Sequence, residues 1–120
     1  METLSRSKSG ESVSKKPSCI KAVKETADLI ASLESNSHFR QIVDEALDTL
    51  KENMFAGSLI EKKKFPKVYV KKYGVKNLYK YNLDRSKRLI YTLVADASGI
   101  AVVVLEILDH KDYEKRFSYK

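Results

Sequence analysis

The residues best suited to chemistry follow the last apolar run of the chain, in the stretch LEILDHKDYEKRFSYK at 105–120. Directly after Leu108 the sequence supplies an imidazole at His110, an ammonium group at Lys111 and a phenol at Tyr113. Histidine is the side chain that most readily takes up and releases protons near neutral pH. A strand that ends at Leu108 would fix the turn after it, so the stretch predicts an acid–base site. The alternative is that His110 is a turn residue bonded to the backbone.

A second concentration of charge lies upstream, where EKKKFPKVYVKKYGVK at 61–76 interleaves lysines with aromatic residues. Residues 61–120 carry 15 Lys and Arg against 7 Asp and Glu, whereas residues 1–60 carry 8 against 9. Such uneven basic charge indicates an anionic partner, with nucleic acid the first candidate, and lysines beside tyrosines suit single-stranded or ribosomal RNA. The alternative is a solvated surface that resists aggregation. The lysines predicted to contact phosphates are Lys62, Lys63, Lys64, Lys67, Lys71, Lys72 and Lys76.

Length and composition limit the other possibilities. The 120 residues suit one domain, predicted at 18–120, after a flexible polar tail at 1–17. Runs of apolar residues are too short for a membrane span, and the polar start of the chain does not read as a secretory signal. A single cysteine, Cys19, fits a reducing, cytoplasmic location, and two distant histidines give no zinc pattern. We therefore expect a cytoplasmic protein that uses no metal or other cofactor.

Apolar residues at spacings of three and four predict two helices in the first half of the chain. The first begins near Ser18 and carries Ile20, Val23, Ala27, Ile30 and Leu33. SNS at 35–37 offers an N-cap for the second helix. Its apolar residues are Phe39, Ile42, Val43, Ala46, Leu47 and Leu50. Asn53 and Gly57 are stop signals, so the pattern predicts a helical hairpin with one apolar side.

The second half of the chain is predicted to form a sheet. Pro66 excludes a helix interior, so the lysine-rich segment is expected to be a loop that leads into a short edge strand at 68–71. Alternating or apolar runs predict three further strands at 77–83, 87–95 and 100–108, with a four-residue loop at 96–99. The predicted fold is α+β: an N-terminal helical hairpin packed on an antiparallel sheet of three to four strands, followed by a short C-terminal helical turn at 111–117.

Three motifs carry a resemblance to a known family: NLYKYNL at 77–83, KRLIYTL at 87–93 and VVVLEILDHKDYEKRF at 102–117. Their order and spacing after a helical hairpin resemble the RelE/ParE superfamily of toxins from type II toxin–antitoxin systems. The RelE-like branch implies a metal-independent endoribonuclease (mRNA interferase) that cleaves mRNA on the ribosome and is neutralised by a small antitoxin. Members usually begin with a strand before the hairpin. The polar start here predicts none, and the lysine-rich segment is the candidate to fill that edge.

The resemblance also implies roles for individual residues. Cleavage without a metal needs a base for the 2′-OH, cations for the phosphorane and a proton donor for the leaving oxygen. His110 is expected to be the acid or base, with Asp109 or Asp112 to orient it. Arg85 and Lys111 are expected to supply the cations, and Tyr113 either stacks a base or donates a proton.

Two further residues, Arg88 and Phe117, each have two possible roles. Arg88 is expected to contact a phosphate or to support its strand, and the second role is slightly favoured. Phe117 either stacks on RNA or packs in the core. Two other functions remain open on the same fold. One is a catalytically weak or silent RNA- or ribosome-binding module, and the other is a ParE-type gyrase inhibitor.

Overall fold

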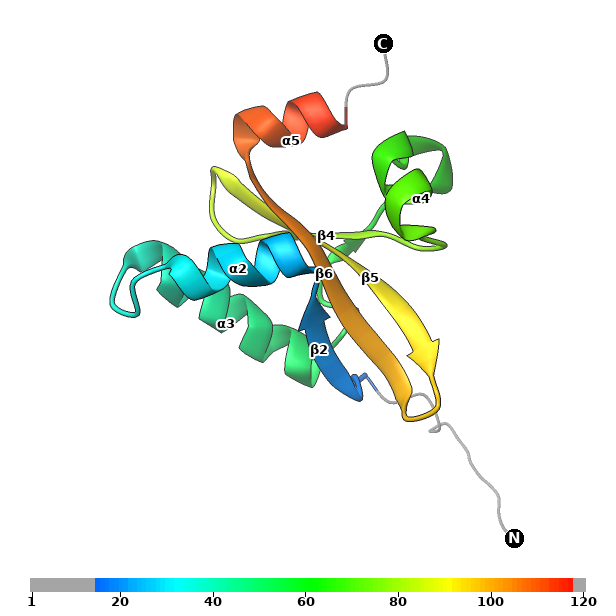
Figure 1. The fold of residues 1–120 in the computed structure, drawn as a ribbon, viewed down its shortest axis with the longest axis horizontal. Helices are drawn as coiled ribbons and strands as arrows, with labels where there is room; N and C mark the ends of the chain where they lie inside the picture. The colour runs from blue at the N-terminus through cyan, green and yellow to red at the C-terminus, as the bar shows by residue number, and fades with distance from the viewer. Residues whose placement is uncertain (1–14, 118–120) are drawn as a thin grey trace, which may run out of the picture.

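A five-stranded mixed sheet forms the centre of the computed structural model, which describes residues 15–117 (Figure 1). The strand order is β2-β6-β5-β4-β3; β2 runs parallel to β6, and the other neighbours are antiparallel. The strands are β2 (Cys19–Ala22), β3 (Ser58–Leu59), β4 (Tyr79–Asn82), β5 (Lys87–Asp96) and β6 (Gly99–Asp109). The α+β class is thus confirmed. The prediction of a purely antiparallel sheet of three to four strands is wrong.

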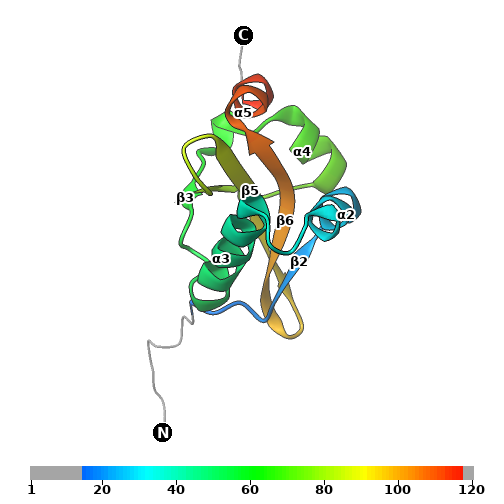
Figure 2. The same ribbon diagram turned by 90° about the vertical axis from the view of Figure 1, so that its left-hand side faces the viewer.

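Helices cover both faces of this sheet. They are α2 (Lys24–Ser32), α3 (His38–Glu52), the 3₁₀ turn η1 (Lys62–Lys64), α4 (Lys67–Tyr73) and α5 (His110–Arg116). Figure 2 shows α3 on one side of β6 and α4 on the opposite side, with α5 at the end of β6. The α2 helix lies beside the β2 edge, where the Thr26 hydroxyl donates to the Leu105 carbonyl at 2.7 Å. The sheet therefore has two differently covered faces.

The first face packs against α3. Its fully buried strand residues are Leu89, Tyr91, Val102 and Val104. They meet Ala46, Leu50 and Met54 from α3 and the residues that follow it. The predicted apolar side of the second helix is confirmed by these contacts.

The second face packs against α4 and α5, and it carries the candidate site. Its buried strand residues are Leu78, Ile90, Leu105 and Leu108. A β-bulge lies here, because Ile90 pairs with Glu106 while Tyr91 pairs with Val104. Leu105 is the extra residue, and a bulge of this kind turns two consecutive side chains toward one side. The bulge explains how Leu105 and Glu106 can both contribute to the second face.

The largest error of the sequence prediction lies at residues 18–24, where a helix was expected. The chain forms β2 there, and α2 begins only at Lys24. Ile20 and Ala22 pack against the first-face core, while Lys21 is exposed. Parallel pairing with β6 brings this segment into the sheet, and nothing local in a four-residue strand signals it. Ile20 and Val23 are also three residues apart, which imitates a helical spacing.

A second error lies at 68–71, predicted as an edge strand, which belongs to α4. Pro66 stands at the N-cap position, where its fixed φ is tolerated, and Gly74 ends the helix with a φ of 61°. Tyr69 and Tyr73 lie four residues apart and both pack toward the second-face core, as one side of a helix requires. The lysine-rich segment therefore fills no vacant edge of the sheet.

The three other predicted strands are confirmed, with small shifts of their ends. β5 and β6 pair up to Asp96 and Gly99, so the loop between them is two residues shorter than expected. Gly99 has a φ of 135°, as its turn position required. Most of the predicted tail, residues 1–14, lies outside the described part of the chain. Within that part, the Lys15 carbonyl accepts a hydrogen bond from the Met54 N–H at 2.7 Å.

Replacing Tyr91 by phenylalanine is expected to lower the free energy of unfolding by about 1–3 kcal/mol, because one buried and one half-buried backbone group lose their partner. The fully buried Tyr91 hydroxyl donates to the Met54 carbonyl (2.8 Å) and accepts from the Gly57 N–H (3.0 Å). Burial raises the pKa of this phenol to about 12. Urea denaturation measures the effect. Tyr81→Phe is the control, since its hydroxyl has no hydrogen-bond partner within residues 15–117; equal losses in both variants would contradict this role.

Candidate active site on the second sheet face

The turn after β6 places His110 at the start of α5. Asp109 is the N-cap of α5, and its carboxylate accepts from the Asp112 N–H at 2.7 Å. His110 is exposed, and its Nε2 lies 3.4 Å from a carboxylate oxygen of Glu114. The predicted helical turn is confirmed. The carboxylate beside the imidazole comes from Glu114, however, and Asp109 is occupied in capping the helix.

Tyr113 lies over two cations of the sheet. Its ring centroid is 5.5 Å from Lys80 Nζ on β4 and 5.8 Å from Arg88 Cζ on β5. Lys80 pairs with Ile90 and Arg88 pairs with Asn82, so both cations project from the second face. Lys80, Arg88 and Tyr113 are called the cation–tyrosine cluster below. The structure thus unites two predicted residues with one that the sequence analysis missed.

Lys80 had a visible signal in the sequence. The alternation of NLYKYNL sets Lys80 and Leu78 on one face of the strand, and Leu78 is buried in the second-face core. A lysine beside a buried leucine must extend over the same surface. What the sequence does not contain is the register of β4 against β5, which brings Lys80 near Arg88.

Arg88 also supports the turn between β4 and β5. Its Nη1 donates to the carbonyls of Asp84 (3.1 Å), Arg85 (3.4 Å) and Lys87 (3.2 Å). The Asp84 carboxylate accepts from the Ser86 N–H at 2.8 Å, and this bond holds the pKa of Asp84 below its usual value. The structural role that was favoured for Arg88 is therefore present, in addition to its contact with Tyr113.

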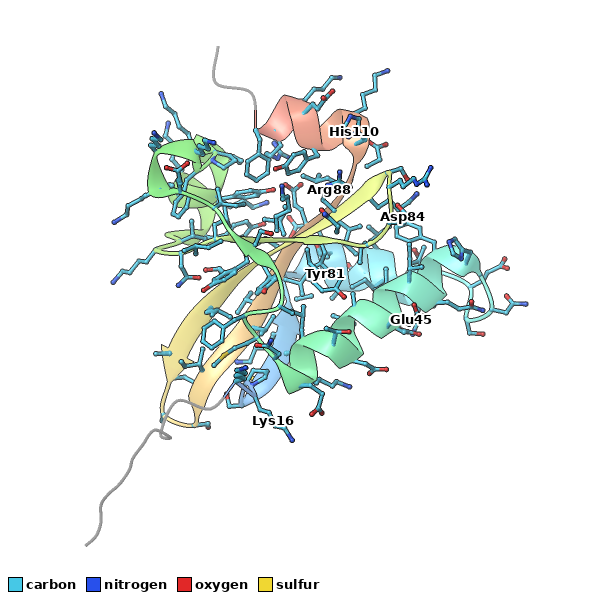
Figure 3. The ribbon with its side chains drawn as sticks, turned by 180° about the vertical axis from the view of Figure 1, so that it is seen from behind. Lys16, Glu45, Tyr81, Asp84, Arg88 and His110 are labelled. Carbon is cyan, nitrogen blue, oxygen red and sulfur yellow. The ribbon has the colours of Figure 1, made fainter. Side chains whose placement is uncertain are left out.

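Arg85 lies in the same turn and is exposed. The turn is next to the start of α5, because Lys87 pairs with Asp109 (Figure 3). His110, Arg88 and the Asp84 turn consequently lie at one end of the molecule, whereas Glu45 lies on α3. This end collects the predicted residues His110, Arg85, Lys111 and Tyr113.

This end carries four cations that are not paired within the described part of the protein, beside the carboxylates of Asp84, Asp109, Asp112 and Glu114. Within residues 15–117, no carboxylate lies within ion-pair distance of Lys80, Arg85, Arg88 or Lys111. A cluster of cations without internal counter-ions attracts an anion from solution, and a phosphate group fits cations that flank an aromatic ring.

The lysine-rich segment contributes a separate basic surface on η1 and α4. Part of its charge is internally paired: Lys63 and Lys64 lie 3.8 and 3.5 Å from Glu61, and Lys72 lies 3.1 Å from Glu25. The hydrogen bond to Glu25 raises the pKa of Lys72. Among the described residues, no carboxylate pairs with the segment's other lysines, which are Lys62, Lys67, Lys71 and Lys76.

Phe117 packs against two aromatic rings and is half-buried. Its ring stacks on Tyr113 with centroids 4.6 Å apart and meets Tyr69 at 6.1 Å. It belongs to the partly buried residues around the second-face core. Of its two open roles the structure shows the packing contact, and Phe117 supports the ring of Tyr113 from behind.

A half-buried carboxylate, that of Glu106, lies beside the site. Glu106 is the one charged residue in the apolar run of β6, and it accepts hydrogen bonds from the Tyr69 hydroxyl (2.5 Å) and from Arg116 Nε and Nη2 (2.8 and 2.9 Å). Tyr69 is 1% exposed, and burial raises its pKa far above the usual range. None of these three residues was predicted from the sequence to belong to the site, although Glu106 is the one charge in the apolar run IAVVVLEIL.

Within residues 15–117, no three His, Cys, Asp or Glu side chains lie close enough together to hold a metal ion. Over the same range, no helix is both long and apolar enough to cross a membrane. Comparison of the chain with protein families, curated proteins and solved structures found no match.

Proposed function

We propose that this protein is a RelE-type endoribonuclease that cleaves mRNA on the ribosome in the cytoplasm and is held inactive by a small antitoxin. The observation that carries the proposal is the cation–tyrosine cluster, which has His110 one helical turn before Tyr113 and no internal counter-ion among the described residues. The element order also supports it: β2 comes before the helices α2 and α3, as the first strand of the family that the motifs resemble does, and the antiparallel strands β4, β5 and β6 follow after β3, η1 and α4.

The chemistry assigned to the site is an attack of the ribose 2′-OH on the adjacent phosphorus. His110 takes the 2′-OH proton as the new O–P bond forms. Lys80 and Arg88 stabilise the extra negative charge of the phosphorane. The 5′-oxygen then leaves with a proton that the Tyr113 phenol donates. The products are a 2′,3′-cyclic phosphate and a 5′-hydroxyl.

The exposed cations assist binding. Arg85 and Lys111 lie at the same end and are placed to contact neighbouring phosphates. Lys111 supplies positive charge but cannot bind a phosphate in the bidentate way that arginine does. It therefore contributes to the affinity for RNA more than to the orientation of the phosphate. The lysines of η1 and α4 extend the basic surface for RNA beyond the reacting group.

The first test is translation of a reporter mRNA in a cell-free extract, followed by primer extension. The purified protein is expected to produce discrete cleavages within the translated region, and blocking initiation is expected to abolish them. An mRNA that stays intact while translation proceeds normally would contradict the proposal.

One observation favours a second candidate, a catalytically silent RNA- or ribosome-binding module. Arg88 Nη1 already donates to three carbonyls of its own turn, so less of the guanidinium is available to a phosphate. In that case the protein binds RNA but leaves it uncut. A gyrase-inhibiting function is distinguished by a supercoiling assay with purified gyrase, which needs no RNA.

Removing two lysines of α4 is expected to weaken RNA binding in a salt-dependent way. Lys67→Gln with Lys71→Gln deletes two cations that pair with no carboxylate in the described range. The slope of log K against log salt should fall by about 1.4 for single-stranded RNA. Filter binding at several salt concentrations measures it. Lys24→Gln with Lys51→Gln, on α2 and α3, is the matched control; an equal change in both pairs would contradict a specific role for α4.

A further inference from the structure

Three segments that are distant in sequence meet at the carboxylate of Glu106. Tyr69 reaches it from α4, Arg116 reaches it from the last turn of α5, and Glu106 itself belongs to the bulged part of β6. Arg116 and Glu106 form a bidentate ion pair, in which Nε donates to one carboxylate oxygen and Nη2 to the other. Such a pair fixes direction as well as distance, so it holds α5 in one rotation about its axis.

The rotation of α5 determines where Tyr113 lies. Arg116 follows Tyr113 by three residues and Phe117 follows it by four, so all three share one side of the helix. That side faces the sheet: Arg116 binds Glu106, Phe117 meets Tyr69, and Tyr113 lies over Lys80. A helix of seven residues is too short to hold this orientation by itself.

The charge of the pair matters as much as its shape. Glu106 is only partly exposed, and an unpaired carboxylate beside the cation–tyrosine cluster would repel a phosphate. Pairing with Arg116 cancels this charge and leaves the cations of the cluster to act on the ligand. The Glu106–Arg116 pair thus orients α5 without placing an unpaired negative charge beside the cation–tyrosine cluster.

We propose that Glu106 is a positioning residue for the cleavage site: through Arg116 it holds α5 so that the Tyr113 ring stays against Lys80 and Arg88 when RNA binds. This inference rests on the proposed function for its catalytic consequence. Its geometric content, the dependence of the Tyr113 ring on the Glu106–Arg116 pair, stands apart from whether RNA is cut.

The test compares Glu106→Gln with the wild-type protein in two measurements. Glutamine keeps the size and one acceptor but loses the charge of the pair. We expect kcat for RNA cleavage to fall about 10- to 100-fold, as displacement of a reacting group by about 1 Å does, with KM changed by less than about twofold. Adding Tyr113→Phe to Glu106→Gln should then cost much less than it costs in the wild-type protein.

The second measurement does not need activity. In protein with ¹³C-labelled tyrosine, the Tyr113 ring signals should move in Glu106→Gln, and their response to a short, uncleavable 2′-deoxy oligonucleotide should weaken. Glu45→Gln removes the same charge from α3, and it should leave kcat and the Tyr113 signals unchanged (Figure 3). If the wild-type protein cuts no RNA, the proposed function fails, while these signals still decide the positioning role.

A folded Glu106→Gln variant with wild-type kcat and unmoved Tyr113 signals would overturn the inference. Arg116→Lys gives an independent decision if Glu106→Gln does not fold. Lysine keeps the positive charge and the helix propensity but cannot form the bidentate ion pair with Glu106. The same fall in kcat and the same movement of the Tyr113 signals are expected, and an unchanged Arg116→Lys variant would overturn the inference equally.

Discussion

Replacing His110 by alanine is expected to slow RNA cleavage by about 10²- to 10⁴-fold, the usual contribution of a general acid or base. The imidazole is exposed at the first residue of α5, so its loss should leave the core and the melting temperature nearly unchanged. Binding of uncleaved RNA should change little, because the cations of the site remain. Single-turnover cleavage and filter binding on the same preparation separate the two effects.

His38→Ala is the matched control, since His38 is also exposed at the first residue of a helix, α3, yet it belongs to no cluster with Tyr113. Its cleavage rate should equal that of the wild-type protein. If His110→Ala keeps full activity, the imidazole has no part in the reaction. If cleavage is absent in both the wild type and the variant while RNA binding is retained, the silent binding module is the better account.

Replacing Arg88 by glutamine is expected to lower cleavage by about 10²- to 10³-fold, the cost of removing one group that stabilises transition-state charge. Arg88 contributes half of the positive charge in the cation–tyrosine cluster. The same change removes the bonds to the carbonyls of Asp84, Arg85 and Lys87, so a loss of stability is also expected. The rate constant must therefore be measured well below the melting temperature of the variant.

Two further variants separate the charge of Arg88 from its structural role. Lys80→Gln removes a cation from the cluster without touching the turn, because the Lys80 ammonium group forms no hydrogen bond with a protein group in residues 15–117. It should reduce cleavage by roughly tenfold or more at unchanged stability. Arg88→Lys restores the charge but not the capping geometry, so it should recover part of the activity and little of the stability. Full activity in Lys80→Gln would contradict the proposed role of the cluster.

The sequence predicted the part of the fold that local patterns determine. The alternation in β4, the apolar run of β6 and the spacing of Val43, Ala46 and Leu50 each arise within one element, so they can be read without a partner. The β2 strand could not be predicted in this way, because only its parallel pairing with β6 distinguishes it from the start of a helix. The edge strand at 68–71 was likewise predicted from Pro66 and the lysines, whereas packing of Tyr69 and Tyr73 makes this segment part of α4.

The candidate site was predictable to the extent that it lies on one segment. His110, Lys111 and Tyr113 stand together in the sequence and remain together at the start of α5. Lys80 joins Tyr113 only through strand register, and Glu106 joins Arg116 only through the bulge in β6. A charged residue in an otherwise apolar central strand was the single sequence signal that pointed to the second pair.

The lysine-rich segment shows a second property that cannot be predicted from the sequence, the pairing of its charges. Its composition indicates an anionic partner, but composition does not say which lysines are neutralised within the protein. Glu25 lies 47 positions from Lys72, and only the folded chain brings α2 beside α4. The number of cations available to RNA is therefore a property of the fold.

The most direct test of the proposed function is the chemistry of the cut ends. A reaction that begins with attack by the 2′-OH must leave a 2′,3′-cyclic phosphate on one fragment and a 5′-hydroxyl on the other. It must also fail when the ribose at the cleavage position is replaced by 2′-deoxyribose. We expect both results with the wild-type protein on translated mRNA, and neither product with His110→Ala at the same protein concentration. Fragments that carry a 3′-hydroxyl and a 5′-phosphate, or cleavage at the 2′-deoxy position, would contradict the proposed reaction.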